Sequence, residues 1–241
     1  MALRRGAVAL AVVLSGASAQ AQNTLSDYTE TVLTHVILHE LGHALIREFD
    51  LPVLANEEVM ADAFATSYVV QNMPDRAVDI IAARAAALET DMDEETVFAE
   101  HPDDVWRAGQ MICLAYGLDP ASFEQLAIDS GMTGNEAGNC RDTAAEVGRA
   151  WRRILVPFAM PEGARVTEVR INIGEGPWAT AVQNSTLPET LRPIMASFDW
   201  HSLVTLQFDN CEGGAYWSRN GRTILVCDDL LARFERQNAA R

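Results

Sequence analysis

Apolar and polar residues follow two different patterns along this chain, which change near Pro161. From Asn23 to Pro157, apolar residues recur at helical spacing and are interrupted by prolines, glycines and acidic stretches. Loops are expected at 89–95 and at the Gly/Asn-rich stretch 131–139. The pattern predicts helices at Ser26–Phe49, Glu57–Gln71, Pro74–Leu88, Asp103–Tyr116, a short segment from Pro120, and Arg141–Leu155.

Beyond Pro161 the pattern alternates with a period of two, as in half-buried strands. The dipeptide Asn220-Gly221 is a strong hairpin signal, and a helix is expected at Leu230–Gln237. The predicted strands are Arg165–Ile173, Leu203–Phe208, Ala215–Ser218 and Thr223–Cys227. We therefore expect an α+β domain, mainly helical at 22–160, with a small antiparallel sheet at 161–241.

The segment His39-Glu40-Leu41-Gly42-His43 carries the clearest chemistry. Histidines four apart on a helix lie on the same face, as two nitrogen ligands of one Zn²⁺ require. Glu40 can then reach a water in the metal's open position as a general base. Gly42 costs a helix about 1 kcal/mol relative to alanine, which suggests close approach of another backbone.

A zinc site of this kind needs a third protein ligand, and the next predicted helix offers one. In zincins of the thermolysin type that ligand is a Glu, and an Asp one turn later orients the first histidine. Glu58 and Asp62 have this spacing, whereas Glu57 and Ala61 do not. We expect Glu58 to bind zinc and Asp62 to accept the outer N–H of His39. The alternative is that Glu57 and Glu58 are ordinary acids of a helix's first turn.

The N-terminal residues 1–21 have the features of an export signal. Arg4 and Arg5 precede an apolar run, and Ala17-Ser18-Ala19 or Ala19-Gln20-Ala21 offers a cleavage site. The run is too short to span a bilayer, and later apolar stretches are broken by charge. We expect an exported protein, periplasmic or secreted, with no membrane span.

Net charge is −16, and every basic residue is an arginine. Such an acidic chain argues against nucleic acid or an anionic membrane as partner. Four cysteines in an exported chain favour two disulfides over a metal site, because no C-x-x-C spacing occurs. Of three possible connectivities, proximity favours Cys113–Cys140 and Cys211–Cys227. With a two-residue hairpin loop, Gly214 lies opposite Cys227, so the second bridge requires the chain to fold back at Gly213-Gly214.

Several segments resemble a bacterial metallopeptidase family that is itself described as a domain of unknown function. They are HELGHALIREFDLPVL, EEVMADAFAT, EHPDDVWRAGQMICLAYGLDP, NC with EVGRAWRRILVP, and NCEGGAYWSRNGRTILVCDDLL. In that family the cysteine-bounded hairpin precedes the zinc helix, whereas here it follows. The resemblance implies a zincin-like layer with a gluzincin-type site: His39, His43 and Glu58 as ligands and Glu40 as catalytic base. It implies no particular substrate.

Other residues have weaker functional interpretations. His101 and Tyr68 are candidate hydrogen-bond donors to a tetrahedral oxyanion, with helix capping and core packing as the respective alternatives. His35, one turn before His39, could line the cleft, and His201 is expected to be structural. The remaining aromatic candidates are expected to form core or cleft walls, and they are Trp106, Trp151, Trp178 and Trp217.

The sequence thus predicts a zinc-dependent peptidase with one Zn²⁺ per chain, acting on a peptide or protein. The alternative is a non-catalytic envelope or binding protein in which zinc joins two helices; a zinc hydrolase of another class is a third possibility. Glu40 favours the peptidase over the non-catalytic protein, since a structural zinc site needs no ionisable group at that position. The sequence does not determine the oligomeric state.

Overall fold

The computed structural model describes residues 23–53, 56–90, 103–161, 163–164 and 169–241. Its helices are α1 (Asp27–Glu48), α2 (Glu57–Asn72), η1 (Pro74–Arg76), α3 (Ala77–Glu89), α4 (Asp104–Leu118), α5 (Pro120–Asp129), α6 (Gly134–Leu155), η2 (Val156–Phe158), α7 (Ala179–Asn184), α8 (Leu187–Met195) and α9 (Asp228–Ala239). Its strands are β1 (Val169–Ile173), β2 (Val204–Asp209), β3 (Ala215–Ser218) and β4 (Thr223–Cys227). The fold is α+β, as the sequence predicted. The predicted export signal lies outside the described residues.

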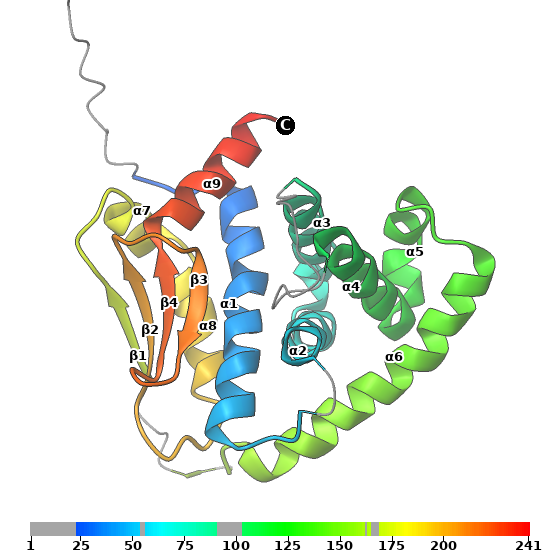
Figure 1. The fold of residues 1–241 in the computed structure, drawn as a ribbon, viewed down its shortest axis with the longest axis horizontal. Coiled ribbons are helices and arrows are strands. Elements are labelled where there is room, and N and C mark those ends of the chain that lie inside the picture. Colours follow the sequence, from blue (N-terminus) through cyan, green and yellow to red (C-terminus); the bar gives the residue numbers. More distant parts are fainter. Residues whose placement is uncertain (1–22, 54–55, 91–102, 162, 165–168) are drawn as a thin grey trace, which may run out of the picture.

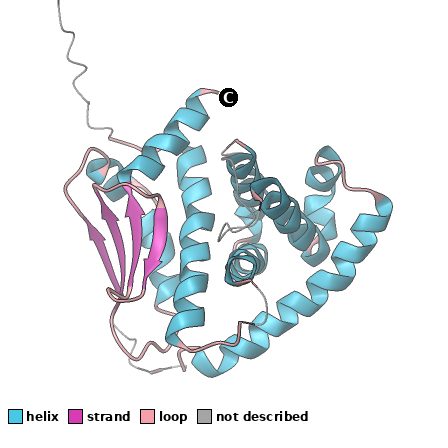
Figure 2. Ribbon diagram, viewed as in Figure 1, coloured by secondary structure: helices cyan, strands magenta, loops and turns pink. Residues whose placement is uncertain are grey.

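Helix α1 is the central element. It lies between the sheet on one side and α2, α3 and α4 on the other (Figures 1 and 2). A helix that is apolar on nearly all sides is stable only when it is covered on all sides, and Leu33, Leu38 and Leu45 are fully buried. Ser26 caps its start by accepting a hydrogen bond from the Thr29 amide at 3.2 Å. The His39–His43 segment therefore lies in the middle of the hydrophobic core.

The sheet is mixed, so the expectation of an antiparallel sheet was wrong. Its strand order is β1-β2-β4-β3; β1 and β4 both pair with β2 in parallel, and only β3–β4 is antiparallel. Parallel neighbours need a long crossover connection, and α7 and α8 supply it between β1 and β2. Neither of these two short helices is predicted from the sequence pattern. Strand β3 forms one edge of the sheet and contacts α1.

Helix α6 begins within the predicted 131–139 loop, which corrects that expectation. Thr133 and Glu136 form a capping box: the Glu136 amide donates to Thr133 Oγ1, and the Thr133 amide donates to Glu136 Oε2. Two backbone donors are thereby satisfied at the helix start. This cap outweighs the low helix propensity of Gly134 and Gly138.

The cysteines pair as expected. Cys113–Cys140 joins α4 to α6, and Cys211–Cys227 joins the segment before β3 to the end of β4. The expected hairpin register is also confirmed, since the Cys227 amide donates to the Gly214 carbonyl at 2.8 Å. Gly213 and Gly214 have φ angles of 114° and 79°, which few other residues adopt. Both glycines allow the chain to fold back toward Cys227.

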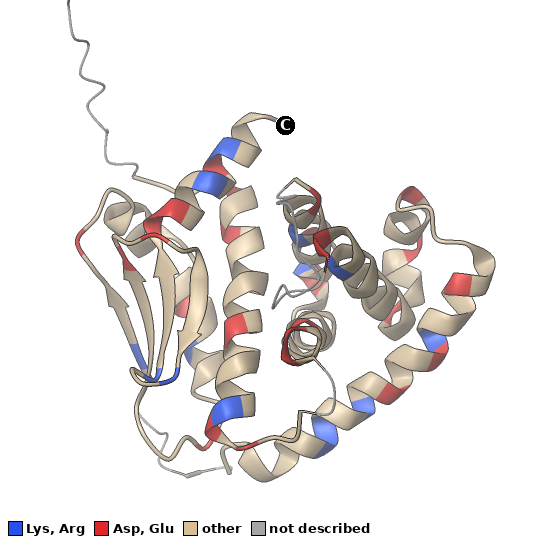
Figure 3. Cartoon of the chain, viewed as in Figure 1, with Lys and Arg blue, Asp and Glu red and all other residues tan. Residues whose placement is uncertain are grey.

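Charged residues are distributed over the helices rather than gathered on one face (Figure 3). Within the described ranges, none of the helices combines the length and the apolar character needed to cross a membrane.

Candidate metal centre

The two helices that carry the site approach unusually closely at Gly42. A Cβ atom added there would lie 3.0 Å from Ala61 Cα and 3.2 Å from Ala61 Cβ. Glycine thus allows the α1 and α2 backbones to pack together directly beside His43 on α1 and directly beside Asp62 on α2. This contact places the histidine face of α1 against the acidic start of α2.

His39, His43 and Glu58 converge at this contact. The Nε2 atoms of the histidines are 3.1 Å apart. Glu58 Oε2 lies 3.2 Å from His39 Nε2, and Glu58 Oε1 lies 3.2 Å from His43 Nε2. Ligands about 2.0–2.1 Å from a tetrahedral zinc are about 3.3 Å from one another, and the approach of each ring to the other and to one Glu58 oxygen is close to this spacing. Over the part of the chain that the structure describes, this is the one group of three or more metal-binding side chains close enough to hold an ion.

A carboxylate fixes the orientation of each histidine. His39 Nδ1 donates to Asp62 Oδ1 at 2.8 Å, and His43 Nδ1 donates to Glu57 Oε1 at 2.9 Å. With the proton on Nδ1, each ring turns an Nε2 lone pair toward its partner and toward Glu58. Three facing lone-pair donors repel one another unless a positive charge, a proton on Nε2 or a metal ion, lies between them. The hydrogen bonding of the rings is thus compatible with a metal ion here.

An arginine holds each of these carboxylates in turn. Arg107 Nε and Nη2 donate to Asp62 Oδ2 and Oδ1 at 2.8 and 3.0 Å. Arg47 Nε donates to Glu57 Oε1 at 2.8 Å, and its Nη2 contacts Oε2. The site therefore contains two chains of the order arginine, carboxylate, histidine.

The expected contact of Asp62 with His39 is present, whereas the sequence does not predict the contacts of Glu57 and the two arginines. Glu57 is interpreted from the sequence as a poorer match than Glu58 for the ligand and as an ordinary first-turn acid, not as a partner of His43. Arg107 occupies the buried face of α4 together with Ala108 and Met111, and only 5 % of its side chain is exposed. A lone arginine on an apolar helix face requires a buried partner, which was the available signal. Arg47 gave no such signal, because its side chain is 41 % exposed.

The electrostatics of the pocket favour positive charge. Burial opposes ionisation of His39, but Asp62 and Glu58 outweigh it and raise the pKa of His39 to about 9. Burial also opposes the charge on Asp62, yet His39 and Arg107 hold the pKa of that carboxyl far below its usual range. Asp62 therefore remains an anion that can orient its histidine.

Glu40 lies beside this group, on the wall of a cavity of about 460 Å³ that His43 and Glu58 also line. Its side chain is 7 % exposed. Burial raises the pKa of Glu40, the neighbouring His39 and His43 counteract this, and the Trp217 backbone hydrogen-bonds the carboxylate. A raised pKa makes a glutamate a stronger base, which suits it to accept and return a proton.

The other candidates take different places. His101 lies outside the described residues. Tyr68 is ten residues beyond Glu58, about 15 Å along α2, and packs beside Phe64, so it does not line the cavity. Its packing beside Phe64 agrees with the alternative of core packing, and its role as an oxyanion donor stays a prediction. His201 is structural, as expected, and contacts the Glu48 carbonyl at 2.7 Å.

His35 does not line the cavity either. It is fully buried behind the site, its Nε2 lies 3.1 Å from Thr66 Oγ1, and burial lowers its pKa to about 3. The tryptophans divide as follows: Trp151 and Trp178 are in the core, Trp217 lines the cavity, and Trp106 is 45 % exposed.

Comparison with known protein families agrees with this geometry. Residues 9–155 match a family described as "Putative metallopeptidase". The chain belongs to this family. The matched range includes all of α1 and α2, with His39, Glu40, His43, Glu58 and Asp62, but ends before the β3–β4 hairpin. Comparison with curated proteins and with solved structures found no match.

Proposed function

We propose that this member of the metallopeptidase family is an exported, zinc-dependent hydrolase of peptide bonds. The observation that carries the proposal is the convergence of His39, His43 and Glu58 beside an open cavity. His43 and Glu58 line this cavity, and Glu40 lines it with them. Three protein ligands leave a coordination position free, as catalytic zinc sites require. A purely structural site has no need of a cavity or of a buried glutamate that binds no metal.

Zinc held by these residues supplies a Lewis acid that polarises a carbonyl group and lowers the pKa of a water. Glu40 accepts the proton of the attacking water and returns it to the nitrogen of the leaving amine. The backbone hydrogen bond from Trp217 fixes the orientation of this carboxylate. Asp62 and Glu57 keep both histidine rings in the tautomer that binds metal.

Glu40→Gln tests the proposal most directly. The amide keeps the shape of the side chain but cannot accept a proton. With a validated peptide substrate, hydrolysis should fall by about 10²–10⁴-fold, while zinc content and melting temperature stay near those of the parent. Glu30→Gln is the matched control on the same helix, ten residues away, and should leave hydrolysis unchanged.

Two outcomes would contradict this function. Full activity in Glu40→Gln would exclude Glu40 as the base. If the zinc-loaded parent cuts no member of a broad peptide library, the alternative of a non-catalytic protein with a structural zinc site is favoured. Export is tested separately: intact mass of the protein from the periplasmic fraction should show cleavage after Ala19 or Ala21.

A further inference from the structure

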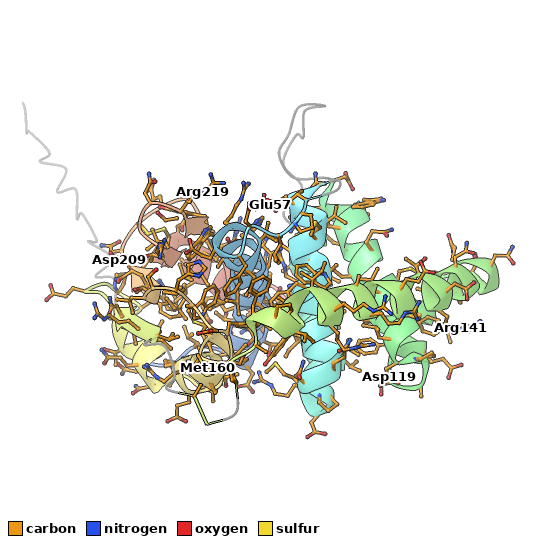
Figure 4. All side chains as sticks on the ribbon, turned by 90° about the horizontal axis from the view of Figure 1, so that it is seen from below. Glu57, Asp119, Arg141, Met160, Asp209 and Arg219 are labelled. Carbon is orange, nitrogen blue, oxygen red and sulfur yellow. A yellow bond between two sulfur atoms is a disulfide. The ribbon has the colours of Figure 1, made fainter. Side chains whose placement is uncertain are left out.

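The cavity in front of the site has three walls. Helix α1 contributes Glu40, His43 and Arg47, and the start of α2 contributes Glu57 and Glu58. The third wall is β3 with its flanking residues, including Tyr216, Trp217 and Arg219. Figure 4 shows Glu57 and Arg219 on the same side of the molecule.

Most charged groups on these walls already have partners. Glu58 faces both histidines, and Glu57 is held by His43 and Arg47. The Arg47 guanidinium is thereby committed to Glu57. Arg219 differs: it is exposed and, within the described part of the chain, has no carboxylate partner.

The charge balance of the cavity then depends on Arg219. Its lining holds three carboxylates and two guanidinium groups. With a divalent ion bound, the net charge of these groups is one positive charge. Without Arg219 the net charge is zero. The cavity thus differs in sign from the chain as a whole, whose net charge is −16. An anionic group complements the cavity, whereas a cationic group does not.

We infer that Arg219 binds a carboxylate of the substrate close to the scissile bond, so that the preferred substrates are acidic at that position. This inference rests on the proposed function. The spacing supports it: the Trp217 backbone contacts Glu40, and Arg219 is two residues further along the chain. Two residues of extended chain span about 7 Å, so the carboxylate lies within about two residues of the cleaved peptide bond. It is either an Asp or Glu side chain or the C-terminal carboxylate of the substrate.

Equilibrium binding can test this independently of hydrolysis. The probes are short peptide hydroxamates, which bind zinc directly, made as a Glu-containing compound and its Gln isostere. Calorimetry on the zinc-loaded parent should show about tenfold tighter binding of the Glu compound, the scale of one charge-assisted hydrogen bond. Arg219→Gln should remove this preference. Arg153→Gln, which replaces an exposed arginine on α6 away from the cavity, should retain it.

A second pair of hydroxamates distinguishes the source of the carboxylate. One compound ends in a free C-terminal carboxylate and the other in an amide. If only this pair depends on Arg219, the residue selects a chain terminus; if only the Glu/Gln pair does, it selects an acidic side chain.

Equal affinity of the parent for both members of both pairs would overturn the inference. So would a preference that persists in Arg219→Gln. If the preference depends on Arg219 but the parent cuts no peptide, the proposed peptidase function fails while the carboxylate site stands.

Discussion

Arg107 and Asp62 form a buried bidentate salt bridge immediately behind the candidate metal ligands. Arg107 Nε and Nη2 donate to the two oxygens of Asp62, and Asp62 Oδ1 also accepts from His39 Nδ1. The orientation of one metal ligand on α1 thus depends on an arginine on α4. A position far away in sequence becomes part of the metal centre through a single carboxylate.

Replacing Arg107 should therefore affect both stability and metal binding. Arg107→Met leaves the Asp62 charge buried without its partner, which costs about 3–5 kcal/mol of unfolding free energy. Zinc affinity should fall about 10–100-fold, the usual effect of losing a group that supports a ligand. Urea denaturation and chelator competition at one fixed pH measure the two effects.

Arg47→Met is the matched comparison on the other histidine. The Arg47 side chain is 41 % exposed, so its removal should cost less than about 1 kcal/mol of stability. Equal losses of stability in the two variants would show that the burial of Arg107 does not determine its importance.

The two adjacent glutamates of α2 should behave differently. Glu58→Gln removes the third ligand, and the purified protein should contain much less than one zinc per chain. Glu57→Gln keeps all three ligands and weakens the hydrogen bond to His43 Nδ1 together with the ion pair to Arg47, so zinc should remain bound with about 10-fold lower affinity. Measuring the zinc content of both variants after dialysis tests this difference. A full zinc site in Glu58→Gln would disprove the proposed ligand set.

Gly42→Ala should destabilise the protein despite alanine's higher helix propensity. The new Cβ meets the Ala61 backbone at 3.0 Å, and the resulting shift of α1 against α2 costs about 1–3 kcal/mol. Alanine recovers only about 1 kcal/mol of helix propensity. Gly109→Ala is the control, because its Cβ would have no atom within 4 Å. That variant should be more stable than the parent in thermal unfolding.

Asp228, which directly follows β4, is expected to make the stability of the protein depend on pH. Burial, together with Asp209 and Asp229, raises the pKa of Asp228 to about 6. The folded state therefore binds this proton more tightly than the unfolded state, and stability decreases as pH rises from about 4 to 6. Because Asp228 is only partly buried, solvent screens its repulsion from the other two carboxylates, and we expect a loss of about 1 kcal/mol of unfolding free energy.

Asp228→Asn should accordingly raise the melting temperature at pH 7.5 by roughly 2–4 °C and change little at pH 4. Asp229 is the control, since it accepts hydrogen bonds from the Gly213 and Gly214 amides at 2.9 and 3.2 Å. Asp229→Asn should lower the melting temperature at pH 7.5. If Asp228→Asn raises the melting temperature equally at both pH values, the ionisation of Asp228 is not the cause of the effect.

The sequence by itself determined the features that depend on local spacing. His39, Glu40 and His43 share one face of one helix because of the helical repeat, and Glu58 and Asp62 are related in the same way on the next helix. The hairpin register followed from Asn220-Gly221, and each disulfide closes a short loop. In each case, residues near in the chain have few ways to be arranged.

Only the tertiary structure determined the strand order and the contacts between residues far apart in sequence. The strand order depends on a crossover through α7 and α8, whose pattern is short and interrupted by Pro188 and Pro193. Arg107 meets Asp62 across 45 residues, and Arg219 reaches the cavity only because β3 forms the sheet edge beside α1. Many partners far apart in sequence are compatible with one helix pattern, and only the packing of complete elements selects among them.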